Sequence, residues 1–394
     1  MKVTTWISTG NLPVSRAAIM ASCNPQTPAN RAAWLSAAKA RPLAVKLAQY
    51  PSPKANEIVV RNAAIAINPS DWLKQDSGDF LYSWVKYPFV LGSDTAGTVV
   101  ETGFSVTRFT AGDRVVGHAV GIDEQSNSSA EGTFQTYTVL RAEMTSPLPD
   151  SMSFESASVI PLGASTAACG LFEKDKLALQ APSTSPKLTG KTLLIWGGST
   201  SVGLNAIQLA VAAGYEVFAT ASPKNHAYMK SLGASRVFDY NSPTVITDLR
   251  KAFEGKTTAG ALTMGAGSAD ASMEVLKHCS GNKFIAMATY PTPSPPPQSL
   301  VLLKTVYAFM SWSVVWYFKS KMNGIRSNFI FGSTLAFNGV GKLIYEDFLP
   351  EALAQGSFVP APEPKIVGEG LESIQAGLDI QKLGVSAKKV VVTL

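Results

Sequence analysis

The stretch Thr192-Leu-Leu-Ile-Trp196, followed by Gly197-Gly-Ser-Thr-Ser-Val-Gly203, decides the fold. Its apolar and β-branched residues predict a buried strand, and its glycines predict a tight turn before the helix Gly203 to Ala213. A helix that begins after such a turn presents free backbone N–H groups to a pyrophosphate. The middle glycine of G-x-G-x-x-G is missing, so the prediction depends on the position of the turn between strand and helix. An ordinary glycine turn is the alternative.

Strands and helices continue to alternate after this turn. This alternation predicts a parallel, doubly wound α/β sheet. A proline-rich run, Tyr290 to Pro297, predicts a stiff linker that ends it. The expected elements are a strand at Glu216–Thr220, a helix at Asn225–Leu232, and strands at Arg236–Asp239, Ala261–Met264 and Lys283–Met287.

The segments before and after this region lack its alternation of strands and helices. Short strand-like runs separated by turns fill Pro42 to Leu148 and predict a β-rich barrel. The chain returns to mixed structure from Gly341 and closes with the strand Lys389–Thr393. With 394 residues, two domains are expected. We expect an extension at 1–29, the β-rich domain at 30–160, the nucleotide-binding domain at 161–324, and a return to the β-rich domain at 325–394.

Charge and hydropathy exclude several classes of protein. Seven of the 34 basic residues precede the first acidic residue, Glu57, and the rest is nearly neutral against 28 acidic residues. No basic patch for nucleic acid is therefore expected. The apolar stretch Thr305 to Phe318 is shorter than the roughly 20 residues of a membrane span and predicts a buried or pocket-lining segment. The first 29 residues fit either an extension or an organellar leader, and we favour an extension on a cytoplasmic protein.

The end of the second strand indicates which dinucleotide binds. NAD enzymes place an Asp or Glu there for the ribose hydroxyl, but this chain has no acid there. Hydroxyl, amide and ammonium groups suit the 2′-phosphate of NADP(H), and a solvated loop is the alternative. The residues expected at this end are Ser222, Pro223, Lys224, Asn225 and Tyr240.

Zinc chemistry is not expected. The three histidines, His118, His226 and His278, do not stand at ligand spacing from any of the three cysteines, and no CxxC pair exists.

Several motifs resemble the medium-chain dehydrogenase/reductase superfamily. The resemblance covers roughly Asn30 to Leu394 and is greatest to the zinc-independent, fungal trans-acting enoyl reductases. Zinc-binding members carry a histidine and a glutamate where this chain has Ser93 and Asp94. The motifs are Asn68-Pro-Ser-Asp-Trp72, Leu91-Gly-Ser-Asp-Thr-Ala-Gly97, Gly112-Asp-Arg-Val115, Gly132-Thr-Phe134, Pro161-Leu-Gly-Ala-Ser-Thr166 and Gly384-Val-Ser-Ala-Lys-Lys389.

The resemblance implies a fold and a set of site residues. The fold would be a GroES-like β-rich domain interrupted by a Rossmann domain. Thr166 would lie near nicotinamide and substrate. The pyrophosphate would be held by Ser199, Thr200, Ser201 and Val202. The nicotinamide would be contacted by Ser70, Asp71, Trp72, Leu73, Met287, Ala288, Val385 and Ser386. The substrate pocket would be lined by Thr166, Ala167, Ala168, Cys169, Gly170, Leu171, Phe172 and Glu173.

Two departures from the family pattern concern the chemistry. Enoyl-reducing relatives place a lysine where Leu73 stands, whereas this chain has Lys74. Lys74 is therefore a candidate proton donor only if the local register shifts. The segment Tyr307 to Asn328 is longer and more aromatic than in relatives, either as a pocket elaboration or as a gene-model artefact.

The expected reaction is NADPH-dependent reduction of an activated C=C bond, with Thr166 positioning the substrate. The substrate implied by the resemblance is an enone or polyketide, free or carrier-bound, with a polyketide synthase as a candidate partner. A quinone or carbonyl reductase, and a non-catalytic NADPH-binding protein, are the alternatives. The chain is expected to be a monomer or homodimer.

Overall fold

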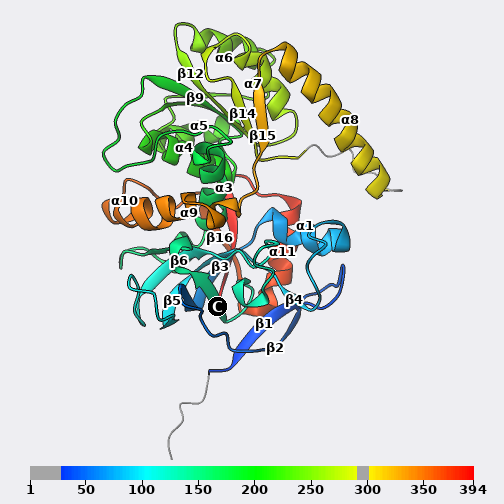
Figure 1. Cartoon of the computed structure of the whole chain (residues 1–394), viewed down its shortest axis with the longest axis vertical. Coiled ribbons are helices and arrows are strands. Elements are labelled where there is room, and N and C mark those ends of the chain that lie inside the picture. Colours follow the sequence, from blue (N-terminus) through cyan, green and yellow to red (C-terminus); the bar gives the residue numbers. More distant parts are fainter. Residues whose placement is uncertain (1–27, 291–300) are drawn as a thin grey trace, which may run out of the picture.

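The computed structural model describes residues 28–290 and 301–394 and places them in two stacked lobes. The upper lobe in Figure 1 contains a seven-stranded sheet whose path runs β11-β10-β9-β12-β14-β15, with β13 beside β12. Every strand pair in it is parallel. The strands are β9 (Lys191–Trp196), β10 (Glu216–Thr220), β11 (Arg236–Phe238), β12 (Thr257–Thr263), β13 (Ser280–Gly281), β14 (Phe284–Met287) and β15 (Arg326–Phe329).

Helices cover this sheet because its strands are apolar on both faces. Leu193 and Ile195 of β9 face one buried cluster, and Leu194 and Trp196 face another. The expected doubly wound Rossmann domain is thereby confirmed. Its helices are α3 (Pro161–Phe172), α4 (Ser201–Ala212), α5 (His226–Ser231), α6 (Val245–Phe253), α7 (Ser268–Leu276) and α8 (Val301–Met322).

The lower lobe is the GroES-like β-rich domain. Its larger sheet follows the order β16-β17-β3-β5-β6-β8, with β7 paired to β3, and a three-stranded sheet has the order β2-β1-β4. The strand-like runs Glu57–Arg61 and Ala63–Ile67, within the region expected to be a β-rich barrel, form one strand, β3 (Glu57–Ala66). The others are β1 (Asn30–Leu35), β2 (Ala44–Ala48), β4 (Phe89–Val90), β5 (Asp94–Thr102), β6 (Arg114–His118), β7 (Tyr137–Arg141), β8 (Thr145–Pro147), β16 (Glu363–Glu369) and β17 (Lys388–Thr393).

The C-terminal segment completes this lower lobe, as the C label in Figure 1 shows. β17 lies between β16 and β3 and pairs Val391 with Ala66. The chain returns to the GroES-like domain later than expected, because β15 still belongs to the Rossmann sheet through its pairing with β14. The boundary between 324 and 325 therefore moves to the end of β15, at Phe329.

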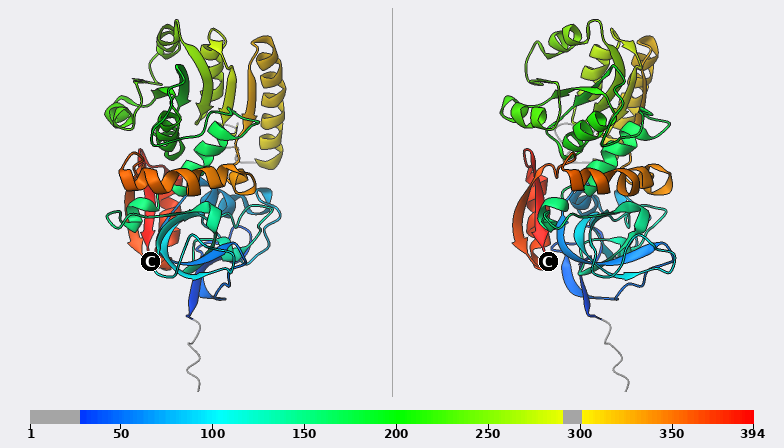
Figure 2. Two further views of the ribbon diagram at one scale, coloured as in Figure 1. Left: turned by 60° about the vertical axis from the view of Figure 1, so that its left-hand side comes forward. Right: turned by 90° about the vertical axis from the view of Figure 1, so that its left-hand side faces the viewer.

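Helices α3, α9 (Val340–Lys342) and α10 (Leu349–Gln355), with the π-helical turn η7 (Leu343–Phe348), lie between the lobes in Figures 1 and 2. Tyr345 of η7 is fully buried, and its hydroxyl donates to the Pro161 carbonyl at 2.9 Å. That hydroxyl also lies 2.8 Å from Ser165 Oγ, which is 2.9 Å from His118 Nδ1. A buried polar chain thus joins both lobes, and burial lowers the pKa of His118 to about 4.

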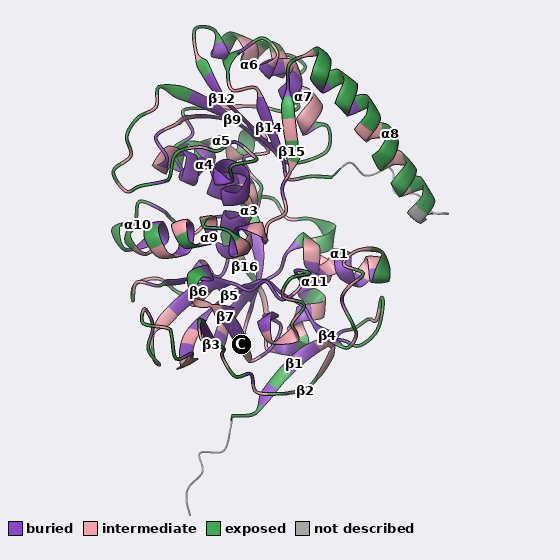
Figure 3. Ribbon diagram, in the orientation of Figure 1, coloured by how far each residue is buried: buried purple, intermediate pink, exposed green. Residues whose placement is uncertain are grey.

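The expectation that Thr305 to Phe318 is buried is wrong for most of the segment, which is exposed. The alternative, a pocket-lining segment, holds for part of it: a hollow of about 620 Å³ beside β14 and β15 is lined by Trp312, Ser313, Trp316 and Tyr317. These residues belong to α8, which lies on the outer flank of the Rossmann domain and is largely exposed in Figure 3. Only one side packs inward, where Trp316 is 6% exposed and Nε1 donates to Ser327 Oγ. Among the described residues, no helix is both long and apolar enough to cross a membrane. Most of the expected proline-rich linker, residues 291–297, lies outside the described residues, as does most of the extension at 1–29.

Candidate functional site

The glycine turn joins the end of β9 to the start of α4. Thr200 is the N-cap of α4: its Oγ1 accepts from the Gly203 N–H at 3.0 Å and donates to the Gly197 carbonyl at 2.9 Å. A Cβ on Gly203 would lie 2.4 Å from that carbonyl oxygen. Glycine is therefore required at this position for the helix to approach the strand so closely.

The turn also has the donors that a pyrophosphate needs. Ser201 Oγ is buried and has no hydrogen-bond partner among the described residues. Ser199 and Val202 are half-buried beside it. An unpartnered hydroxyl at the N-terminus of a 12-residue helix fits an anionic ligand. The residues present therefore fit the pyrophosphate of a dinucleotide.

The residues expected at the adenosine end come together at the carboxyl ends of β10 and β11. Ser222 Oγ donates to the Tyr240 hydroxyl at 3.3 Å. Pro223 to Asn225 form a single 3₁₀ turn, and Lys224 is exposed. In the described part of the chain, no ion pair is found for Lys224. This arrangement offers one cation and several hydroxyl or amide groups, which is the chemistry that suits a phosphate.

Helix α1 (Pro69–Ser77) carries the run expected on the nicotinamide side, but its residues point in different directions. Asp71 is 2% exposed, and its carboxylate accepts from the Asn68 N–H at 2.8 Å. Burial raises the pKa of Asp71 to about 7. Trp72 Nε1 donates to Gln381 on α11 (Ile374–Leu383). Ser70 and Leu73 are the two residues of this run whose side chains are accessible and have no such hydrogen bond among the described residues. Direct contact of the Asp71 and Trp72 side chains with a nicotinamide is therefore not supported.

The structure does not support Lys74 as a proton donor to substrate. Its side chain is fully buried, and Nζ donates to the carbonyl oxygens of Gly78 at 2.8 Å and of Leu81 and Tyr82 at 3.0 Å. Burial also lowers the pKa of Lys74. All three ammonium protons are therefore used to hold the loop after α1.

Helix α3 places Thr166 differently from the residues after it. Thr166 is half-buried, and its hydroxyl packs against Gly332. The contact is so close that a Cβ at position 332 would lie 2.4 Å from the Thr166 Oγ1. Burial does not favour a substrate-lining role for the rest of the run, because the helix is packed into the core. Cys169 lies 3.4 Å from the Thr334 hydroxyl, which donates to Glu173 at 2.6 Å. The buried members are Ala167, Ala168, Cys169, Gly170, Leu171, Phe172 and Glu173.

The remaining nicotinamide candidates lie at strand ends. Met287 ends β14, its side chain belongs to the apolar cluster shared with α7 and α8, and its carbonyl accepts from the Ile330 N–H at 2.9 Å. The Ala288 N–H donates to the Thr263 carbonyl at 2.9 Å. Val385 is half-buried and Ser386 is exposed in the turn before β17.

Sequence reasoning missed Tyr82. Its carbonyl accepts from Lys74, and its backbone φ of 54° is in the left-handed region that aromatic residues rarely adopt. Its ring lies 5.6 Å from that of Trp84 and 6.2 Å from that of Phe331, which adjoins Gly332 and hence Thr166. Burial raises the pKa of Tyr82 to about 12. No periodicity or motif marks this residue, because its position depends on a loop held by Lys74.

A second missed feature is a buried network around Asp94. Its Oδ2 lies 2.8 Å from Lys389 Nζ and accepts from Asn68 Nδ2 at 2.9 Å. Zinc needs thiolate, imidazole or free carboxylate ligands, but Asp94 is already paired with an ammonium. These residues do not fit a zinc ion. Among residues 28–290 and 301–394, no group of three or more His, Cys, Asp or Glu side chains could hold a metal.

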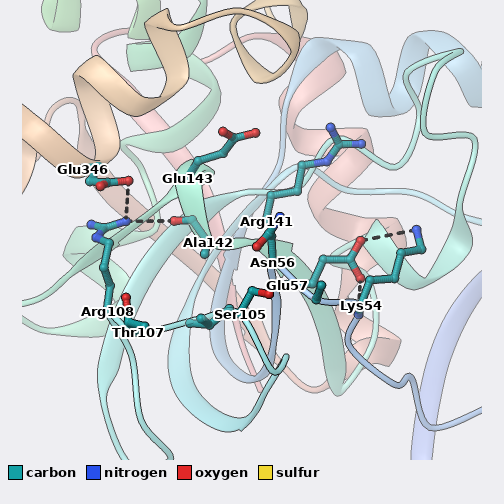
Figure 4. A pocket seen from close by; sticks show the side chains of 12 residues that line it. Lys54, Asn56, Glu57, Ser105, Thr107, Arg108, Arg141, Ala142, Glu143 and Glu346 are labelled. Atoms are coloured by element: carbon teal, nitrogen blue, oxygen red, sulfur yellow. Dashed lines mark hydrogen bonds and ion pairs between the residues drawn. The ribbon is translucent and has the colours of Figure 1, made fainter.

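A polar hollow of about 450 Å³ lies away from all these residues (Figure 4). Lys54, Arg108, Arg141 and Glu346 are among its lining residues, and Arg108 donates to the Ala142 carbonyl and contacts Glu346. Its charged groups are thus largely paired with one another, and none of the expected site residues lines it.

Comparison with known proteins agrees with this architecture. Residues 54–150 match the alcohol dehydrogenase GroES-like domain, and residues 201–316 match the zinc-binding dehydrogenase family. Dehydrogenase pigH of Monascus ruber is 59% identical over 369 residues, covering 93% of this chain and 100% of that protein. Trans-enoyl reductase himH of Aspergillus japonicus is 38% identical over 367 residues, covering 93% and 97%.

A solved structure shows the same fold. The crystal structure of CurK enoyl reductase superposes with a TM-score of 0.68 at 20% identity, covering 92% of this chain and 99% of that one. The chain therefore belongs to the medium-chain dehydrogenase/reductase superfamily, in the branch that includes fungal dehydrogenases and trans-enoyl reductases.

Proposed function

We propose that this oxidoreductase uses NADPH, without zinc, to reduce an activated C=C bond. The observation that supports NADPH most directly is the adenosine end. Ser222 contacts Tyr240 there and Lys224 lies exposed in the next turn, at the strand end that carries an acid in NAD enzymes. The enoyl reaction is supported by a relative named trans-enoyl reductase that matches nearly the whole chain.

Each part of the chain has a separate task in this proposal. When bound, NADPH supplies a hydride. The turn from Ser199 to Val202 would hold the pyrophosphate, and Ser222 to Asn225 the 2′-phosphate. The Thr166 hydroxyl would orient the substrate carbonyl and stabilise the negative charge that develops on its oxygen.

The proton donor in this proposal is Tyr82 in place of Lys74. A tyrosine hydroxyl is protonated at neutral pH, and the Tyr82 ring lies against Phe331 beside the segment that contacts Thr166. Replacing Tyr82 by Phe removes only the hydroxyl. We expect kcat for an enone to fall about 100-fold, in line with the loss of a general acid, with an unchanged dissociation constant for NADPH. An unchanged kcat would exclude this role.

The substrate and partners follow from the same relatives. We propose an enone or polyketide substrate, free or carrier-bound, in secondary metabolism in the cytoplasm, with a polyketide synthase as the candidate source of a carrier. The chain acts as a monomer or homodimer.

An acceptor panel tests the function. Purified protein is mixed with NADPH or NADH and with a conjugated enone, a quinone or an aldehyde, and cofactor absorbance is followed. We expect turnover of the enone with NADPH. Turnover of the quinone or aldehyde alone would assign a quinone or carbonyl reductase. NADPH binding without oxidation by any acceptor would assign a non-catalytic binding protein.

A further inference from the structure

The carboxylate of Asp94 joins three segments that are far apart in the sequence. Asp94 begins β5 and is fully buried. Its Oδ2 contacts Lys389 Nζ at 2.8 Å and Asn68 Nδ2 at 2.9 Å, and its Oδ1 accepts from the Leu162 N–H at 2.7 Å. Lys389 also donates to Asn68 Oδ1 at 2.5 Å. The ion pair and its amide partner thus form a closed, buried network.

Each partner of Asp94 belongs to a segment that the proposed function places near the nicotinamide. Asn68 is the N-cap of α1. Leu162 is the second residue of α3, one helical turn before Thr166. Lys389 lies in β17, directly after the closing segment, which is the turn 384–387 that carries Val385 and Ser386. The Asp94 carboxylate therefore links all three site segments, in addition to the backbone pairing of β17 with β3 and the Ile67 N–H that donates to the Val390 carbonyl at 2.9 Å.

The electrostatics explain why one side chain can do this. Removing one partner of a buried ion pair leaves an uncompensated charge, which strongly disfavours the native geometry. The carboxylate also lies at the N-terminus of α3, where the helix dipole stabilises a negative charge. The ammonium of Lys389 supplies positive charge beside Ser93 and Asp94, the positions at which zinc-binding relatives have histidine and glutamate.

We propose that Asp94 and Lys389 are positioning residues that align α1, α3 and the closing segment around the nicotinamide half of the cofactor. This inference rests on the proposed NADPH-dependent function. It separates the two ends of the cofactor, because Ser222 to Asn225 at the adenosine end share no hydrogen bond or ion pair with this network among the described residues.

The test compares whole NADPH with adenosine 2′,5′-bisphosphate, which lacks the nicotinamide half. Asp94→Asn keeps the side-chain shape and removes the charge. We expect the NADPH dissociation constant to rise about tenfold and kcat for the enone to fall about 100-fold, since small misplacement of reacting groups is costly. The dissociation constant of the bisphosphate should change less than about twofold, because its contacts are distant.

Four further variants keep the test decisive. Glu131→Gln is the matched control, since Glu131 is also a buried carboxylate in the GroES-like domain, 3.3 Å from Arg141 Nε, and should change neither binding constant. Lys389→Arg keeps the cation and should restore much of the NADPH affinity lost in Lys389→Met. If Asp94→Asn does not fold, Asp94→Asn with Lys389→Met removes both charges and should fold.

The outcomes separate this inference from the function on which it rests. Parallel changes in NADPH and bisphosphate affinity, or normal NADPH affinity and kcat in the charge-free double variant, would overturn the positioning role. A wild-type protein that neither binds NADPH nor reduces the enone would overturn the proposed function instead.

Discussion

Lys224 is the residue at which we expect cofactor selectivity to be decided. Replacing Lys224 by Ala removes the cation beside Ser222, so KM for NADPH should rise about tenfold, the loss of one charge-assisted contact, with no change in KM for NADH. Steady-state kinetics with both cofactors measure this. Lys230→Ala, which removes an exposed lysine from the neighbouring helix α5, is the control and should change neither KM. An equal effect on both cofactors would remove Lys224 from the 2′-phosphate site.

Asp71 gives a pH dependence with a defined sign. Burial raises its pKa from 3.8 to about 7, so the folded state favours the protonated acid. The stability from this group is present below pH 4 and is lost as the pH rises through 7, on the order of 4 kcal/mol at most.

Replacing Asp71 by Asn removes that titration. The unfolding free energy of the variant relative to wild type should therefore increase between pH 4.5 and pH 8, as measured by urea denaturation at each pH. A difference that stays constant across this range would show that Asp71 has the same pKa in both states.

At the scale of elements, helix α8 has two unlike faces. Met310 and Val314 are 63% and 57% exposed, whereas Trp316 is 6% exposed. Apolar surface of this extent on a single helix reduces solubility. We expect Met310→Glu with Val314→Lys, a favourable i,i+4 pair, to raise solubility and leave the unfolding temperature nearly unchanged. Trp316→Ala, on the inner face, should cost about 3–5 kcal/mol. A large loss of stability in the outer-face variant would contradict this exposure.

Helix α3 shows why a run of residues cannot be assigned to a pocket from sequence. Its small residues suit a ligand wall and a close helix contact equally well. Ala167 and Ala168 are fully buried in the core that also contains Leu204 and Ile207 of α4. Within the run from Thr166 to Glu173, only Thr166 is half-buried and the others are buried, and this follows from the packing of the helix between the lobes.

At the scale of the whole molecule, the last strand holds the first domain together. β17 pairs with β3 and β16, and Val390, Val391 and Val392 are fully buried. Deleting residues 388–394 would expose these contacts, at about 1.5–3 kcal/mol for each valine, which is comparable with the stability of a whole domain. We expect loss of the cooperative unfolding transition in calorimetry, whereas deletion of Leu394 alone should keep it. A folded, active truncation would contradict this role.

The sequence by itself determined the class of fold and the glycine turn that we propose binds the phosphates of the cofactor. Local spacing is sufficient at the glycine turn. Within the seven residues from Gly197 to Gly203 the chain must reverse direction, bring α4 close to β9 and cap the N-terminus of α4. The confirmed Rossmann alternation likewise depends on segments that are neighbours in the sequence. The expected preference for NADPH could also be inferred from the sequence. It depends only on the residues that directly follow β10, where no acidic residue stands.

Only the tertiary structure decided the chemistry at the junction of the lobes. Lys74 is turned into the loop that it supports, and Tyr82 is brought to Phe331 from another part of the chain. Asp94 meets Lys389 across almost 300 residues. Such contacts depend on how the two lobes pack and on which side of a helix is buried, and no local pattern of residue types records either.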